Sequence, residues 1–570
     1  MSTMVKNPPA EKKSVRPPIV QTTVGNYLLD QLFSLGVEHI FGIPGDYVLR
    51  FNKQIEQHQI KFINTTRENT AGYMADAYAR LRGLGVACIT YGVGINIANA
   101  LSQAYVENSP IVVISGSPGT DEIIEGHKLH HLLNKQSTAG KMDTTQLDIF
   151  KHVTVDQAVL DNPATARAQI DRVLMNCLRL KKPVYIEIPR NIVAQPMNAE
   201  PGKLQVRFTS DPDALKESLE EVSNILKKCQ KPVIWAGHEI QRFGLGSKLL
   251  AFAEKFRIPV VSSLLGKTVI SENHPLFAGV YQGDISQLEV SEFVDSCDCL
   301  ILLGTILTDV DTGIFTAGLH QEMKISATSE TIEIGHHTYP KVSFTNFVEG
   351  LAQLKLNVRF RHDYPANIDR RQIPFIPKKG AKTTTARVFE CIQSHLISKP
   401  IVVTDVGDCL LGSSDLTLEE SSFLACAYFA TLGFGTPGAI AAQIAAPKRR
   451  VIGIIGDGAF QMTSMELSTA VRYKLDPIII VLNNHGYGTE RPLLDGAYND
   501  IQEWNYSAIP QVIQGGIGIK VETEEELERA LTQALKTRGQ FTLIEVELDR
   551  MDFSPAMLRF TSNVRGKAKG

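Results

Sequence analysis

Two turns built from small and oxygen-bearing residues could bind a metal ion and a phosphate. Gly-Asp-Gly at 456–458 and Asn-Asn-His-Gly at 483–486 each follow an apolar run that predicts a strand. In a parallel sheet both turns fall on the carboxyl edge, where ligands bind in such folds. Carboxylate and amide oxygens are hard ligands suited to Mg²⁺ or Ca²⁺, and glycines let the backbone approach a phosphate closely. We therefore predict a divalent cation held by Asp457, Asn484 and the backbone at Gly486, with diphosphate oxygens completing its coordination.

A second group of residues could move protons. Asp46 follows a Pro-Gly turn, His130 and His131 are adjacent, and Glu490 lies shortly after the metal-binding turn. Carboxylates and imidazoles are the usual general acids and bases of enzymes. Each residue also has a structural interpretation: Asp46 as a turn residue, the histidines as a solvated pair, and Glu490 as an ion-pair partner of Arg491.

The elements that must position these residues form a repeating pattern. From Thr22 onward, short apolar strands alternate with amphipathic helices, which predicts an α/β fold with parallel sheets. Thr-Ser-Met-Glu at 463–466 has the spacing of a capping box, which predicts that a helix begins there. The predicted strands cover 39–41, 62–64, 86–90, 111–114, 183–189, 232–236, 258–261, 299–303, 401–404, 451–455, 478–482 and 542–546.

Two stretches of different composition divide the chain. Residues 195–207 are mostly polar and lack a clear period, and 359–385 combine prolines with many charges. We predict a flexible arm at 1–20 and three doubly wound parallel-sheet domains at 21–195, 196–365 and 366–570. A chain of 570 residues is too long for one hydrophobic core, so a multidomain arrangement is expected.

Composition excludes several classes of protein. The net charge of -3 gives no reason to expect a nucleic acid partner, and no apolar run approaches the roughly 20 residues that span a bilayer. The first twenty residues lack the apolar segment of a signal peptide. The eight cysteines include no CxxC pair, which favours a reduced, cytoplasmic protein. Gly-Val-Gly at 92–94 lacks the spacing of a nicotinamide site.

The motifs taken together resemble one enzyme family. Gly-Asp-Gly, followed after 24 further residues by Asn-Asn, resembles the signature of thiamine diphosphate enzymes. The nearest subgroup is the pyruvate, indolepyruvate and branched-chain 2-keto acid decarboxylases. The segments that carry this resemblance are HIFGIPGDY, RENTAGYMADAYAR, LHHLL, RRVIGIIGDGAFQMTSMEL, NNHGYGTE and YNDIQEWNY. The resemblance implies a pyrimidine-binding, a central and a diphosphate-binding domain. It also implies active sites between two subunits, in a homodimer at minimum and usually a tetramer.

The resemblance also assigns roles to particular residues. Glu68 would hold a ring nitrogen of the cofactor's aminopyrimidine, although a glutamate at a helix start can instead stabilise the helix dipole. Leu432 would wedge between the two cofactor rings. Asp46 and His131 would form a charge-coupled pair, with His130 and Glu490 completing the catalytic set. The other expected cofactor contacts are Val406, Asp408, Ala430, Thr431, Gly456, Asp457, Gly458, Ala459, Asn484, Gly486, Tyr487, Gly488 and Thr489.

The implied reaction is the non-oxidative decarboxylation of a small-molecule 2-keto acid to an aldehyde and CO₂, with thiamine diphosphate and Mg²⁺. Leu410 stands where pyruvate enzymes tend to carry a large aromatic residue. With Thr489 and Leu493 also expected in the pocket, a branched or aromatic acid is favoured over pyruvate. One alternative is a carboligase of the acetolactate synthase kind, which the tandem histidines and Glu490 disfavour.

A second alternative is a paralogue that binds the cofactor but has altered activity. Three departures from the family pattern support it. Ala430 replaces a glycine, Val406 replaces Thr or Gln, and the loop after His131 is longer and differs in sequence.

Overall fold

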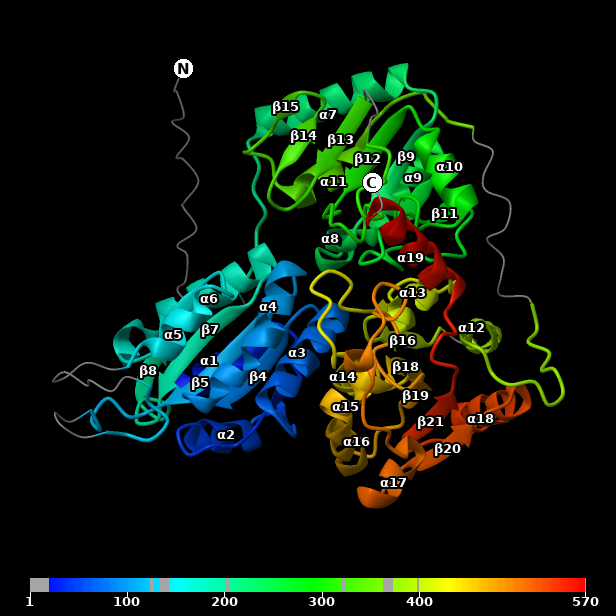
Figure 1. Ribbon diagram of the computed structural model, residues 1–570. Coiled ribbons are helices and arrows are strands. Elements are labelled where there is room, and N and C mark those ends of the chain that lie inside the picture. The colour runs from blue at the N-terminus through cyan, green and yellow to red at the C-terminus, as the bar shows by residue number, and fades with distance from the viewer. Residues whose placement is uncertain are drawn as a thin grey trace, which may run out of the picture.

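The computed structural model of the chain contains three α/β units (Figure 1). It describes residues 20–123, 128–133, 143–199, 202, 204–319, 323–361, 373–396 and 399–568. Most of the predicted N-terminal arm, and residues 134–142 of the loop after His131, lie outside the described residues. Within the described ranges, no helix is long and apolar enough to cross a membrane.

The first unit is built on a six-stranded sheet of order β3-β2-β4-β5-β7-β6, in which every pairing is parallel. A separate antiparallel pair joins β1 to β8, so the strand just beyond residue 195 returns to this unit. Its elements are β1 (Val20–Thr23), α1 (Val24–Ser34), β2 (His39–Gly42), α2 (Leu49–Glu56), β3 (Lys61–Asn64), α3 (Glu68–Arg82), β4 (Gly85–Thr90), α4 (Ala98–Val106), β5 (Ile111–Ser117), α5 (Thr145–Phe150), β6 (Gln157–Val159), α6 (Pro163–Leu180), β7 (Val184–Pro189) and β8 (Pro196–Ala199).

The central unit has a seven-stranded sheet of order β11-β10-β9-β12-β13-β14-β15. Its first five strands are parallel, whereas β14 and β15 add an antiparallel edge to the predicted parallel sheet. Its elements are α7 (Pro212–Lys228), β9 (Pro232–Ala236), α8 (His238–Arg242), α9 (Gly246–Phe256), β10 (Val260–Ser262), β11 (Phe277–Val280), α10 (Leu288–Asp295), β12 (Cys299–Leu303), β13 (Met323–Ala327), β14 (Ile332–Ile334), β15 (His337–Thr338) and α11 (Phe344–Gln353).

The third unit repeats the all-parallel arrangement, with the order β17-β16-β18-β19-β21-β20. Its elements are α12 (Thr385–Ser394), β16 (Ile401–Thr404), α13 (Asp408–Ser414), β17 (Phe423–Leu424), α14 (Gly435–Ala445), β18 (Val451–Gly456), α15 (Asp457–Thr463), α16 (Leu467–Arg472), β19 (Ile478–Asn483), α17 (Ile509–Val512), β20 (Ile517–Val521), α18 (Glu524–Lys536), β21 (Thr542–Glu547) and α19 (Pro555–Ala568). The three all-parallel or mainly parallel sheets confirm the predicted fold class.

The first and third units share one hydrophobic core, because the apolar faces of α3 and α14 pack against each other. A buried ion network crosses the same interface. Arg80 on α3 contacts Asp76 at 2.8 Å and Glu107 at 2.7 Å, and donates to the carbonyl of Ala425 in the third unit. Buried charges that are fully paired in this way fix the relative position of the two units.

Candidate active site

Asp457 lies directly after β18, as the first residue of α15, and its side chain is buried at the sheet edge. Its carboxylate accepts hydrogen bonds from the backbone N–H groups of Gly458 at 2.8 Å and Gly486 at 2.9 Å. The second bond ties the turn after β18 to the turn after β19. Burial raises the pKa of Asp457 to about 6, because the charged form loses its hydration. A cation at this position would stabilise that charged form.

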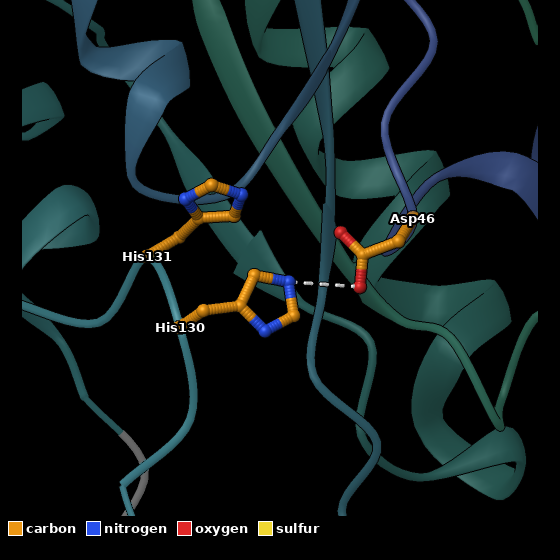
Figure 2. Close-up of side chains that lie close together, drawn as sticks. All are labelled: Asp46, His130 and His131. Atoms are coloured by element: carbon orange, nitrogen blue, oxygen red, sulfur yellow. Dashed lines mark ion pairs between the residues drawn. The ribbon is translucent and has the colours of Figure 1, made fainter.

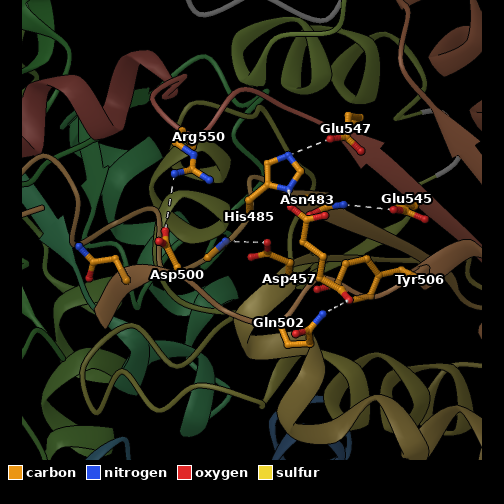
Figure 3. A network of polar contacts seen from close by, with 12 residues as sticks. Asp457, Asn483, His485, Asp500, Gln502, Tyr506, Glu545, Glu547 and Arg550 are labelled. Atoms are coloured by element: carbon orange, nitrogen blue, oxygen red, sulfur yellow. Dashed lines mark hydrogen bonds and ion pairs between the residues drawn. The ribbon is translucent and has the colours of Figure 1, made fainter. Parts of the chain in front are cut away.

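The two asparagines that end β19 have different surroundings. Asn483 donates to Glu545 on β21 at 3.1 Å, and His485 contacts Glu547 on the same strand at 2.8 Å (Figure 3). The side chains of Asn483 and His485 therefore connect the end of β19 to β21. Within the part of the chain that the structure describes, the side chain of Asn484 makes no hydrogen bond. A Cβ on Gly488 would stand 2.2 Å from the Asn484 amide nitrogen, so a larger residue there would displace the Asn484 side chain. The amide of Asn484 therefore remains available to a ligand.

The predicted helix after Thr463 forms, as a 3₁₀ turn at Ser464–Glu466 that leads into α16, but the predicted capping box does not. The Thr463 side chain makes no cap hydrogen bond, and Thr463 is itself the last residue of α15. The Thr463 hydroxyl donates to the carbonyl of Gly433, and the Glu466 carboxylate accepts from Thr66 of the first unit at 2.6 Å. The spacing of Thr463 and Glu466 is that of a capping box, but each side chain forms a hydrogen bond with a residue distant in sequence instead.

Asp405, which sequence reasoning missed, organises the segment that carries Leu432. Its fully buried carboxylate accepts from the N–H groups of Val406 at 3.0 Å, Gly433 at 3.1 Å and Gly435 at 2.8 Å. Burial raises the pKa of Asp405 to about 6. An acidic residue directly after an apolar strand was the signal that could have found it.

Ala430 has a positive φ of 55°, in the left-handed region where glycine is favoured. This agrees with the glycine found at this place in the family pattern. The neighbouring Thr431 hydroxyl lies 2.9 Å from the Asn99 amide nitrogen and 3.2 Å from the Tyr73 hydroxyl of the first unit. The segment thus contacts the first unit on one side and Asp405 on the other.

Asp408 and Leu410, both on α13, are engaged in packing. Asp408 accepts from the backbone and hydroxyl of Ser554, and burial raises its pKa to about 6. Leu410 is buried in the core on one face of the third sheet. The Asp408 side chain therefore links α13 to the segment before α19, rather than pointing freely into the site.

Glu490 is exposed, and its backbone N–H bonds to Tyr487. It is not the partner of Arg491, whose guanidinium contacts Asp495 at 3.0 Å and Asp500 at 2.7 Å. The structural interpretation of Glu490 as that partner is therefore wrong. Thr489 packs against Gly407, where a Cβ would stand 2.4 Å from the Thr489 hydroxyl.

The second cluster lies in the first unit, near the carboxyl ends of its strands (Figure 2). Asp46 follows β2, and its carboxylate lies 3.1 Å from His130 Nε2. The ring of His131 packs edge-on against that of His130, at 4.6 Å between centroids. One ligand-type atom from each of the three residues lies within 4.8 Å of the others. The predicted pairing of Asp46 with His131 is corrected: the ion pair forms with His130.

Tyr47 and Arg190 complete this cluster and were not anticipated. Tyr47 stacks on His130 at 4.9 Å and donates to its carbonyl at 2.9 Å. Burial raises the pKa of Tyr47 to about 12, so the hydroxyl remains a donor at neutral pH. Arg190, after β7, lies 3.3 Å from Asp46 and also pairs with Glu122. Asp46 is therefore shared between an imidazole and a guanidinium.

Backbone features hold the histidine segment against β4. Gly92 has a φ of 80°, and a Cβ there would stand 2.0 Å from the carbonyl of His131. Leu133 N–H donates to Asp143 at 3.0 Å, which anchors the segment beyond the histidines. Gly92 thus makes room for the histidine segment.

Glu68 opens α3 and is half-buried. Its carboxylate accepts from the Asn96 amide at 3.0 Å, and Asn96 lies in the turn after β4. No hydrogen bond or ion pair among the described residues joins Glu68 or Glu490 to the histidine cluster. A single chain therefore presents three separate groups: the Asp457 turn, Glu68 and the histidine cluster.

Comparison with protein families defines the class. Three thiamine pyrophosphate enzyme domains match in order: the N-terminal TPP-binding domain over residues 22–140, the central domain over 219–352 and the C-terminal TPP-binding domain over 405–546. The chain belongs to the thiamine pyrophosphate enzyme family.

Individual relatives are similar along nearly the whole chain. Indole-3-pyruvate decarboxylase of Azospirillum brasilense is 36% identical, over 94% of this chain and 96% of its own length. Pyruvate decarboxylase 2 of Arabidopsis thaliana is 32% identical, over 99% and 94% respectively. An alpha-keto-acid decarboxylase of Mycolicibacterium paratuberculosis is 31% identical, over 93% and 94%.

Proposed function

We propose that this chain is a 2-keto acid decarboxylase that releases CO₂ and an aldehyde. The observation that carries the proposal is the Asp46–His130–His131 cluster at the edge of the first sheet. Its imidazoles and carboxylate supply acid–base groups that cofactor binding alone would not need. The named decarboxylases that match over nearly the whole chain support the same reaction.

The third unit would hold thiamine diphosphate through Mg²⁺. Asp457, the amide oxygen of Asn484 and the carbonyl of Gly486 would bind the metal, since all three are hard oxygen ligands. The buried carboxylate with its raised pKa and the unbonded Asn484 amide fit this role. When bound, the cofactor supplies the nucleophilic carbon that attacks the keto group and accepts the electrons left by departing CO₂.

The protein's own side chains would then hold the cofactor ring and transfer protons. Glu68, fixed by Asn96, would hold the cofactor's pyrimidine ring. Glu490 would deliver a proton to the carbon that has lost CO₂. Asp46 would orient His130, so that this imidazole serves the same proton transfers.

We propose a branched or aromatic substrate. Leu410, Thr489 and Leu493 would line the pocket, and none carries the bulk of an aromatic ring. The side chain of Leu493 is 38% exposed and therefore available to a substrate.

We also propose that the active site forms between two copies of the chain, within a homodimer or tetramer in the cytoplasm. Val93, Met462 and Met465 expose large apolar side chains near predicted site residues, and a second copy would cover them. All eight cysteines are free thiols, the state kept in a reducing compartment.

A panel of keto acids tests the proposal. Purified protein with thiamine diphosphate and Mg²⁺ is given pyruvate, 3-methyl-2-oxobutanoate, phenylpyruvate and indolepyruvate, and CO₂ and aldehyde are measured together. Equimolar CO₂ and aldehyde, with kcat/KM highest for a branched or aromatic acid, is the expected result. Cofactor binding without turnover of any acid would leave the altered-activity paralogue, and a coupled two-keto-acid product would indicate the carboligase. As a companion, Glu490→Gln should bind cofactor normally and lose turnover.

A further inference from the structure

A cysteine, a histidine and a glutamate converge between two helices of the third unit, outside the proposed cofactor site. Cys391 is on α12 and His395 caps its C-terminus, and Glu528 faces them from α18. The Cys391 sulfur lies 3.5 Å from Glu528 Oε2, and His395 Nε2 lies 3.3 Å from Glu528 Oε1. One ligand-type atom of each lies within 4.8 Å of the others. Three side chains of metal-binding type therefore point to one place.

The hydrogen bonds of His395 determine which ring nitrogen faces the cluster. Nδ1 lies 2.8 Å from the carbonyl of Cys391, one turn earlier on the same helix. A carbonyl only accepts, so the N–H at Nδ1 donates to it and Nε2 is the nitrogen that faces Glu528, with the Thr532 hydroxyl 3.4 Å from the same atom. Two acceptors at 3.3 Å repel each other unless a proton or a metal ion lies between them. Bonding of the distal N–H to a backbone carbonyl is also how ligating histidines are oriented.

We propose that Cys391, His395 and Glu528 bind a zinc ion, with a water molecule as the fourth ligand. Thiolate sulfur, imidazole nitrogen and carboxylate oxygen form a ligand set typical of Zn²⁺. With bonds of about 2.0–2.3 Å, tetrahedral zinc places its ligand atoms about 3.3–3.6 Å apart. Cys391 Sγ lies 3.5 Å from Glu528 Oε2, and His395 Nε2 lies 3.3 Å from Glu528 Oε1. Both separations fall in that range, and the carboxylate would turn to present one of its oxygens to the ion. The thiol proton leaves to solvent on binding, and the thiolate and carboxylate then neutralise the ion.

The site is selective and accessible. Mg²⁺ prefers oxygen ligands and is bound poorly by a thiolate, so the cofactor's metal does not compete here. The side chains of His395 and Glu528 are 15% and 31% exposed, which leaves an entry path for the ion. Cys391 and Glu528 are 137 residues apart, so the ion would cross-link α12 to α18.

Cobalt substitution tests the proposal on the full chain, kept in saturating thiamine diphosphate and Mg²⁺. Co²⁺ bound to a thiolate gives a near-ultraviolet charge-transfer band, and Zn²⁺ should displace it. The Asp46–His130–His131 cluster contains no cysteine, so Co²⁺ bound there does not produce this band. One Co²⁺ per chain with the band, displaced by one Zn²⁺, is the expected result.

Variants separate the zinc site from other binding. Cys391→Ser should abolish the band, and His395→Gln and Glu528→Gln should each weaken Zn²⁺ binding about 100-fold or more, beyond the usual cost of losing an outer-shell partner. Glu390→Gln removes an exposed carboxylate from the same helix and should leave binding unchanged. A folded wild-type chain that shows no band, or equal Zn²⁺ affinity in the wild type and the Glu528→Gln variant, would overturn the proposal. In that case a proton bridges His395 and Glu528.

Discussion

Glu107 offers a test of how the first unit holds the third. Its side chain is fully buried, and one carboxylate oxygen contacts Arg80 at 2.7 Å. The other accepts from the N–H groups of Tyr428 and Phe429 at 2.9 Å each, directly before Ala430. Replacement by Gln keeps the shape but leaves one oxygen for three donors. The amide NH₂ must then face a donor in a site closed to solvent.

Breaking one partner of a buried ion pair costs about 3–5 kcal/mol. At roughly 2–4 °C per kcal/mol for a unit of 150–250 residues, Glu107→Gln should lower the apparent Tm by at least roughly 6 °C. Glu38→Gln is the matched control. Glu38 contacts Arg82, which lies on α3 like Arg80, at 2.6 Å, and the Glu38 side chain is 56% exposed. An exposed pair contributes under about 1 kcal/mol.

Differential scanning fluorimetry of both variants, with and without cofactor, measures the difference. The loss of the Tyr428 and Phe429 anchors should also weaken thiamine diphosphate binding in Glu107→Gln and leave it unchanged in Glu38→Gln. Melting temperatures within a degree of each other would refute the argument that burial decides the effect, since the two ion pairs have nearly equal length.

Three further variants test the proposed site. Ala430→Gly should raise stability by about 1 kcal/mol in denaturant unfolding, because glycine adopts the φ of 55° without strain; a loss would show that the methyl group packs favourably. Asp405 keeps its proton to about pH 6 when folded but loses it near pH 4 when unfolded, so its contribution to stability falls by about 3 kcal/mol as the pH rises through that window. Asp405→Asn should therefore gain stability relative to wild type between pH 4 and 7, and an unchanged difference would contradict the assignment. Asp457→Asn should weaken Mg²⁺-dependent cofactor binding about 100-fold or more in a fluorescence titration, and equal affinity would place the metal elsewhere.

The fold could be predicted where strands are long and buried. The strands at 451–455 and 478–482 appear as apolar runs because both faces of a parallel sheet are covered. The edge strand β20 alternates half-buried and exposed residues, and β15 has only two residues, so neither forms such a run. The antiparallel strand β14 was not predicted from the sequence for the same reason.

The candidate site was predictable only for residues inside contiguous motifs. Asp457 lies between two glycines and Asn484 lies two residues before Gly486, each after an apolar strand, where the sequence itself indicates a turn. Arg190 acts through a contact with a segment far along the chain, and no local pattern marks such a contact. Asp405 follows an apolar strand, but the sequence does not indicate its distant partner Gly433. The choice of His130 over His131 as partner of Asp46 depends on ring orientation, which tandem histidines do not specify.

Helix α3 carries both a proposed cofactor-binding residue and a residue of the interface with the third unit. Glu68 starts α3, and Arg80, three turns later, holds the third unit through Ala425 and Glu107. Any rotation of α3 that repositions Glu68 must also disturb the Arg80 network and the loop before Ala430. The buried charges therefore do more than stabilise the interface: they couple the position of the proposed pyrimidine-binding carboxylate to the segment that presents Leu432. A substitution that loosens Arg80 should for this reason impair the site even though it touches none of its groups.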